Sequence, residues 1–140
     1  MASDFSDSAI ALTTKNAKRL EVSDYTVIKS DLFDKIDKRY DMILSNPPYI
    51  ESKVIDGLMP EVRDYEPRLA LDGDADGLKF YRAIIENAES YLNEKGYILF
   101  EIGNHQAHDV QQLLVDKHFE DVRVVKDLAE NDRVVIGRKA

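Results

Sequence analysis

The sequence predicts an α/β fold with a mostly parallel sheet and an antiparallel carboxyl-terminal ending. Short apolar runs typical of buried strands alternate with longer segments whose apolar residues recur at helical spacing. This alternation indicates a parallel sheet with helices on both faces. The last two apolar runs are joined by a short turn at Asn131 and Asp132, which indicates an antiparallel pair. The 140 residues are enough for one domain with a hydrophobic core.

The first part of the chain is expected to form strand, helix, strand and strand. A strand at residues 2–4 leads into a helix that Ser6 or Asp7 can cap. The apolar face of this helix is formed by Ile10, Ala17 and Leu20. Two further strands are expected at residues 26–29 and 40–45, because both runs are apolar and bounded by turn residues.

The segment from residue 50 to residue 76 is long for a loop and contains Pro60, Pro67 and many acidic residues. Long segments of this kind in a compact domain are usually lids or binding loops, or else disordered. After it the pattern predicts a helix, a strand, a helix and two strands. These elements are expected at residues 78–92, 97–102, 110–114, 122–126 and 134–138.

Composition and charge restrict the function classes. The chain has no cysteine, which excludes disulfides and thiolate metal sites. No apolar stretch approaches the ~20 residues of a membrane helix, and the start shows no signal-peptide pattern. The net charge of −8 argues against a large nucleic-acid footprint, unless a segment outside the chain carries basic charge. We therefore expect a cytoplasmic protein that has no direct contact with nucleic acid or membrane. No metal site is expected from the histidines His105, His108 and His118.

Asn-Pro-Pro-Tyr at residues 46–49 is the most informative motif. Two consecutive prolines cannot extend a central strand, because each lacks a backbone N–H and has a fixed φ. The chain must leave the sheet at Asn46, at the carboxyl end of a strand, where open α/β sheets place ligand sites. A side-chain amide, a backbone carbonyl and an aromatic ring suit the binding of a planar –NH2 group. The alternative is a stiff turn without function.

Several further blocks, together with this motif, resemble the release factor glutamine methyltransferases of the HemK/PrmC type. The most specific is Pro-Glu-Val-Arg-Asp-Tyr-Glu-Pro-Arg-Leu-Ala-Leu at residues 60–71, which does not belong to methyltransferases in general. The other blocks lie at residues 2–9, 30–33, 77–82, 101–103 and 132–138. The resemblance covers essentially the whole chain. It implies the Rossmann-like fold of S-adenosylmethionine-dependent methyltransferases and the methylation of a glutamine side-chain amide.

The same resemblance implies that parts of the family's architecture precede the chain. Family members carry an amino-terminal helical domain, then a first sheet strand and a glycine-rich turn around the cofactor. None of the six glycines here has Gly-x-Gly spacing. We therefore expect residues 1–140 to be a partial methyltransferase catalytic domain that lacks the first strand and the glycine-rich turn. Its activity would then be lost in isolation.

The resemblance also assigns cofactor contacts to individual residues. It implies that Asp4 accepts hydrogen bonds from the ribose hydroxyls of S-adenosyl-L-methionine and that Asp31 accepts one from the adenine amino group. It implies that Leu32 packs on the adenine ring and that Asn46 lies beside the reacting methyl group. Taken alone, Asp4 could be an acid at a helix start, and Asp31 a turn-forming residue.

The substrate contacts implied by the resemblance lie in the Asn-Pro-Pro-Tyr motif. The Asn46 side-chain oxygen and the Pro47 carbonyl would each accept one N–H of the substrate amide, while Tyr49 would stack against it. Pro48 would stiffen the loop. The role of Glu101 stays open between a weak general base and a structural carboxylate. The acidic stretch at residues 61–76 stays open between a substrate-binding segment and a solvated lid.

The implied substrate is the glutamine of the Gly-Gly-Gln segment of a peptide-chain release factor. A second hypothesis is methylation of an exocyclic amine of adenine or guanine in nucleic acid, which the same four residues could perform. The block at residues 60–71 and the acidic charge favour the protein substrate. A third hypothesis is an inactive fragment that only binds.

Overall fold

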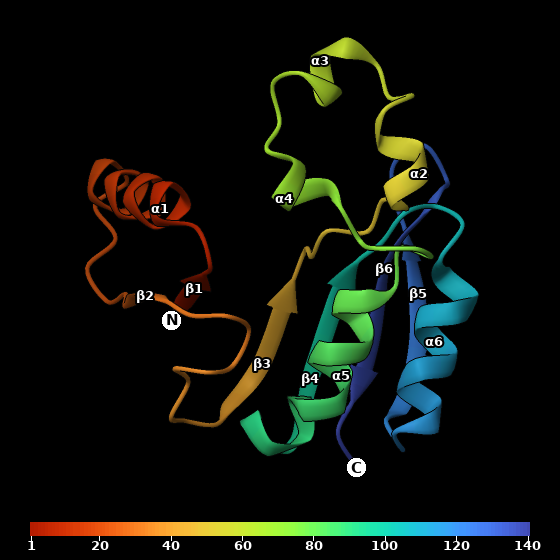
Figure 1. Cartoon of the computed structure of the whole chain (residues 1–140). Coiled ribbons are helices and arrows are strands. Elements are labelled where there is room, and N and C mark those ends of the chain that lie inside the picture. The colour runs from red at the N-terminus through yellow and green to blue at the C-terminus, as the bar shows by residue number, and fades with distance from the viewer. The chain divides into compact units, whose positions relative to one another are not determined.

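The computed structural model describes all 140 residues. They form two compact units, residues 1–38 and residues 39–140 (Figure 1). None of the helices is both long and apolar enough to span a membrane.

Residues 1–38 form a small βαβ unit. β1 (Ala2–Asp4) pairs in parallel with β2 (Val27–Lys29), and α1 (Asp7–Arg19) connects the two strands. Ser6, one of the two predicted caps, caps α1: its side chain accepts a hydrogen bond from the backbone N–H of Ala9. No residue of α1 is buried, so its predicted apolar face does not form part of a hydrophobic core.

Residues 39–140 are built on a four-stranded mixed sheet with the order β3-β4-β6-β5. Its strands are β3 (Tyr40–Ser45), β4 (Leu92–Glu101), β5 (Glu120–Lys126) and β6 (Asp132–Arg138). β3 and β4 are parallel, whereas β6 runs antiparallel to both β4 and β5. The predicted antiparallel ending is confirmed. β4 begins at Leu92 rather than at residue 97, because the chain enters the strand directly from the preceding helix.

Two helices cover one face of this sheet. α5 (Lys79–Tyr91) and α6 (Ala107–Asp116) lie side by side on it (Figure 1). The fully buried side chains of the core are Tyr81, Leu92, Ile98, Phe100, Ile102, Val110, Leu114 and Val135. Each contributes roughly 1.5–3 kcal/mol of transfer free energy when buried. The alternation of elements predicted helices on both faces. Within this unit only one face has them, because the remaining long helix, α1, belongs to residues 1–38.

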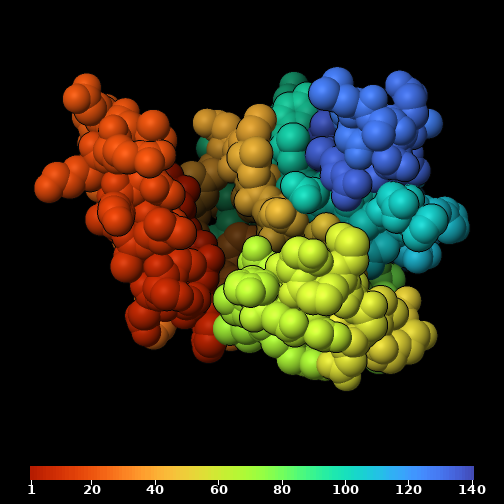
Figure 2. Space-filling view, turned by 90° about the horizontal axis from the view of Figure 1, so that it is seen from above, coloured from red at the N-terminus to blue at the C-terminus, as the bar shows by residue number.

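The segment after β3 folds into short helical turns instead of an open loop. They are α2 (Ser52–Ile55), α3 (Pro60–Arg63) and α4 (Arg68–Leu71), and Figure 2 shows them gathered in one yellow-to-lime lobe. Pro60 is the first residue of α3 and Pro67 precedes α4, both positions where the missing N–H of proline costs nothing. Such single turns are too short to produce a periodic apolar pattern, so the sequence did not predict them.

Candidate active site

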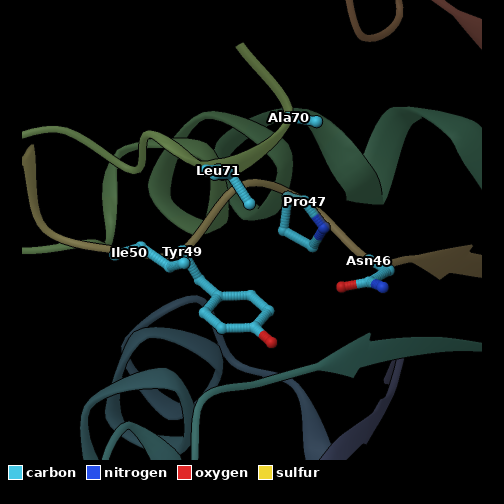
Figure 3. Close-up of a pocket in the computed structure, with 6 residues that line it drawn as sticks. All are labelled: Asn46, Pro47, Tyr49, Ile50, Ala70 and Leu71. Carbon is cyan, nitrogen blue, oxygen red and sulfur yellow. The ribbon is translucent and has the colours of Figure 1, made fainter. Parts of the chain in front are cut away.

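The Asn-Pro-Pro-Tyr loop leaves β3 at its carboxyl end, as predicted. It forms one wall of a pocket with a volume of about 170 Å³. The pocket is lined by Asn46, Pro47, Tyr49, Ile50, Ala70 and Leu71 (Figure 3). In Figure 3 the Asn46 side chain and the Tyr49 ring extend to the same side of the loop. Asn46 is exposed, whereas the neighbouring Pro47 is buried.

Two hydrogen-bond acceptors of the loop have no partner within the chain. No donor of the chain bonds to the side-chain oxygen of Asn46 or to the backbone carbonyl of Pro47. Both groups border the pocket. A ligand that carries an –NH2 group could therefore donate one N–H to each of them without displacing an internal bond.

The loop is fastened on one side to the segment that follows α4. The N–H of Ile50 donates to the Leu71 carbonyl at 2.9 Å, and the N–H of Gly73 donates to the Ile50 carbonyl at 2.8 Å. Gly73 permits this approach, since a Cβ there would lie 2.9 Å from the backbone carbon of Tyr49. The lobe of short helices is thereby tied to the Asn-Pro-Pro-Tyr loop through backbone bonds.

Gln106 fastens the loop on its other side. Its Nε2 donates to the carbonyls of Tyr49, at 3.0 Å, and Gly77, at 3.2 Å, while its Oε1 accepts the N–H of Gly103 at 3.0 Å. Sequence reasoning missed this residue. The available signal was a lone glutamine three residues after Gly103, just before a helix, and such a position does not reveal a partner 57 residues away.

The buried Tyr81 is electrostatically coupled to Tyr49. The hydroxyl of Tyr81 donates to the backbone carbonyl of Glu101 at 2.8 Å. Burial raises the pKa of Tyr81 well above its usual range, and the charges of Tyr49 and Glu101 raise it further. Tyr49 itself is half-buried. Glu101 ends β4, one residue before the expected strand end, and its backbone carbonyl has this structural partner.

The predicted cofactor residues Asp4, Asp31 and Leu32 lie in the other unit, residues 1–38. Asp4 ends β1, and its carbonyl accepts the N–H of Ser30 at 3.0 Å, which places Asp31 at the neighbouring strand end. One carboxylate oxygen of Asp4 accepts the N–H of Ser6 at 2.8 Å, which fixes its orientation. Leu32 has a φ of 45°, a strained conformation for a branched residue.

The structure thus brings the predicted residues together in two groups. Asp4, Asp31 and Leu32 gather in residues 1–38, at the carboxyl edge of a parallel pair. Asn46, Pro47, Pro48 and Tyr49 form one loop in residues 39–140. The carboxylates suit hydroxyl and amino donors, and the strained Leu32 marks a backbone held in place by its surroundings. This set of acceptors fits the hydroxyl and amino groups of a nucleoside.

Comparisons with known proteins agree with the predicted family. Residues 1–61 match the family model described as methyltransferase small domain. The chain is 45% identical over 139 residues to the release factor glutamine methyltransferase of Fusobacterium nucleatum, covering 98% of this chain and 39% of that protein. It is also 45% identical to the enzyme of that name from Geobacter sulfurreducens, covering 95% of this chain and 47% of that protein. The chain therefore spans half the length of these curated relatives or less.

Several solved structures that share the fold are described as methyltransferases. A methyltransferase from Pyrococcus furiosus aligns with a TM-score of 0.71 at 17% identity, covering 99% of this chain and 61% of that one. The release-factor-specific protein-(glutamine-N5) methyltransferase of Alicyclobacillus acidocaldarius aligns with a TM-score of 0.52 at 23% identity, covering 99% and 77%. A Streptococcus mutans protein in complex with SAH aligns with a TM-score of 0.63 at 10% identity, covering 99% and 74%. These likenesses concern the fold, and they confirm the predicted methyltransferase architecture.

Proposed function

Because this chain is homologous over nearly its whole length to release factor glutamine methyltransferases, we propose that the protein containing it methylates a glutamine side-chain amide. The methyl donor is S-adenosylmethionine, and the substrate glutamine lies in the Gly-Gly-Gln segment of a peptide-chain release factor. The observation that carries this proposal is the pair of unoccupied acceptors, the Asn46 side-chain oxygen and the Pro47 carbonyl, at the carboxyl end of β3.

The chemistry requires orientation more than activation. An amide nitrogen is a weak nucleophile, because its lone pair is delocalised into the carbonyl, whereas S-adenosylmethionine supplies a methyl group on an electrophilic sulfonium. Asn46 and Pro47 each accept one N–H of the substrate amide, hold its nitrogen in line, and stabilise the positive charge that develops there. Tyr49 forms a wall of the slot, and Pro48 stiffens the loop because its φ is fixed.

The cofactor contacts are assigned residue by residue. Asp4 accepts from the ribose hydroxyls, Asp31 accepts from the adenine amino group, and Leu32 packs against the ring. The carboxylate of Asp4 is already oriented by the N–H of Ser6. Asn46 lies where the methyl group is transferred. These assignments rest on the carboxylate acceptors in residues 1–38 and on the resemblance of the surrounding motifs to those of the family.

A protein substrate is favoured over nucleic acid by charge and by space. The net charge of −8 opposes contact with phosphates. The pocket of about 170 Å³ is smaller than the ~300–1,000 Å³ of ordinary small-molecule sites, and it suits the end of a side chain. A flipped base needs a wider cavity in which to stack.

Methyl transfer from labelled S-adenosylmethionine tests the proposal directly. The full-length protein is incubated separately with a peptide-chain release factor, duplex DNA and transfer RNA. We expect label in the release factor and none in either nucleic acid. A release factor whose Gly-Gly-Gln glutamine is replaced by alanine is the control and should stay unlabelled. Label confined to nucleic acid would overturn the proposal, and so would no transfer to any substrate by a protein that binds the cofactor.

A further inference from the structure

We propose that Gln106 is the positioning residue that sets the place of the Asn46–Tyr49 loop during methyl transfer. This inference rests on the proposed function, because it concerns the presentation of the two acceptors in that loop. Gln106 touches neither acceptor directly. It acts through the backbone carbonyl of Tyr49, to which its Nε2 donates at 3.0 Å.

The side chain of Gln106 joins three separate segments. Its amide donates to the carbonyls of Tyr49, in the loop after β3, and Gly77, just before α5, and it accepts from the N–H of Gly103, after β4. Both ends of one planar amide are therefore used, so the plane of the group is fixed by its partners. The side chain is half-buried, which strengthens these bonds relative to exposed ones.

The backbone around Gln106 leaves just enough space for this arrangement. Gly77 has a φ of 72°, and a Cβ there would lie 2.7 Å from Nε2 of Gln106 and would also overlap the Tyr49 carbonyl. Any larger residue at this position would have to displace either the loop or the glutamine. The chain thus places a glycine where the two meet.

Gln106 is not explained by capping of its own helix. It precedes α6 at the cap position, yet its side chain makes no cap hydrogen bond there. Its backbone carbonyl alone serves the helix, by accepting the N–H of Val110. The side chain points instead to the loop that carries Asn46.

A displacement at Tyr49 reaches the reacting groups through stiff backbone. Only Pro48 separates the anchored residue Tyr49 from Pro47, and both prolines have fixed φ angles. The fixed φ of Pro48 removes one of the few bond rotations that could absorb a shift of the Tyr49 carbonyl before it reaches the Pro47 carbonyl. An error of about 1 Å in a reacting geometry can cost roughly a hundredfold in rate.

The kinetic test compares Gln106→Ala with Gln112→Ala in the full-length protein. Gln112 lies on the same helix but bonds only to the exposed Asp116, so it is a matched control. For Gln106→Ala we expect kcat to fall roughly ten- to a hundredfold, with the dissociation constant for S-adenosylmethionine within about twofold of wild type. Gln106→Glu keeps the size and the bond from Gly103 but sets a carboxylate against two carbonyls, so it should be at least as impaired. A folded Gln106→Ala protein with wild-type kcat would overturn the inference.

A second measurement keeps this inference separable from the proposed function. In the full-length protein, Gln106→Ala should shift the amide NMR signals of Tyr49 and Ile50 and speed the exchange of the Ile50 and Gly73 amide protons. Gln112→Ala should leave all of them unchanged. If wild type transfers no methyl group, the proposed function fails while these signals still test the positioning role. Unchanged signals and exchange in Gln106→Ala would refute that role.

Discussion

Asn46 and Tyr49 lie in one short loop but are held in different ways. The side chain of Asn46 is exposed and has no partner within the chain, while the carbonyl of Tyr49 is bonded to Gln106. The next residue, Ile50, is bonded through both its N–H and its carbonyl. In the proposed function, the anchored backbone holds the position of Asn46 while its side chain stays available to bind the substrate amide.

This division predicts different effects for two substitutions in the full-length protein. Asn46→Ala should lower kcat by an amount equivalent to roughly 3–4 kcal/mol, because the lost bond strengthens in the transition state. Binding of S-adenosylmethionine should change little. Asp4→Ala should instead weaken cofactor binding, as measured by calorimetry. Asn87→Ala, on the exposed side of α5, is the control and should change neither quantity. Normal turnover by Asn46→Ala would refute the proposed role of this loop in binding the substrate amide.

Tyr81 predicts a measurable effect on stability. Tyr81→Phe leaves the Glu101 carbonyl without its hydroxyl donor and should lower the free energy of unfolding by about 1–3 kcal/mol. Because burial raises the pKa of Tyr81 in the folded protein, its contribution is complete below its unfolded pKa of about 10 and is lost as the pH rises.

Urea unfolding at pH 7 and at pH 10.5 checks both parts of this prediction. The wild-type chain should lose more stability between the two pH values than Tyr81→Phe does. Tyr65→Phe is the control, since Tyr65 is 84% exposed and its hydroxyl has no structural role. Equal stability of the wild-type and Tyr81→Phe chains at pH 7 would show that the hydrogen bond of the Tyr81 hydroxyl makes no net contribution to the free energy of unfolding.

Among the elements, long periodic segments were predictable and short irregular ones were not. The runs that became β3, β5, β6, α5 and α6 were identified within a few residues, because each buries a regular apolar pattern. The three short helices at residues 52–71 were not identified, since each is a single turn held largely by turn bonds and ion pairs, and Ile55 is the only residue that they bury. The site followed the same rule. The local motif at residues 46–49 was visible, whereas the contact of Gln106 joins residues far apart in sequence.

Ser52 and Asp72 illustrate how the short helices are held to one another, since Ser52 begins α2 and Asp72 directly follows α4. The Ser52 hydroxyl donates to the Asp72 carboxylate, which holds the pKa of that carboxyl below its usual range, with help from the N–H of Asp74 and the charge of Arg68. A lowered carboxyl pKa stabilises the folded state above the unfolded pKa of about 3.9. That stabilisation is lost as the pH falls through the folded value.

Ser52→Ala should raise the pKa of Asp72 toward its ordinary value, because the largest cause of the shift is removed. Carbon-detected NMR titration of the side-chain carboxyls measures this directly. Asp64 provides an internal reference, since the pKa of its carboxyl is lowered by Arg63 and not by Ser52. A pKa of Asp72 that did not move in Ser52→Ala would show that the hydroxyl is not its main partner.

At the scale of the whole molecule, the hydrophobic core is unevenly distributed. Every residue of the buried hydrophobic core lies between Ile55 and Ile136, inside the unit of residues 39–140. In residues 1–38 the one buried residue is the polar Ser30, and α1 has no buried residue. Since apolar burial is the dominant favourable term in folding, residues 1–38 contribute little stability of their own. The predicted cofactor carboxylates, Asp4 and Asp31, belong to this less stable unit.

We therefore expect hydrogen exchange to divide the chain at residue 38. Amides of α1 and β2 should exchange through local opening, whereas those of β4 and β6 should exchange only on global unfolding. In the full-length protein, S-adenosylmethionine at a hundred times its dissociation constant should slow exchange at β2. A ligand that binds only the folded form of this unit raises the free energy of its local opening by up to ~2.7 kcal/mol. Asp4→Ala should remove that protection at the same cofactor concentration, while Asp7→Ala, at an exposed ion pair with Lys29, should retain it. Uniform exchange across both units, or cofactor protection unchanged in Asp4→Ala, would contradict this assignment.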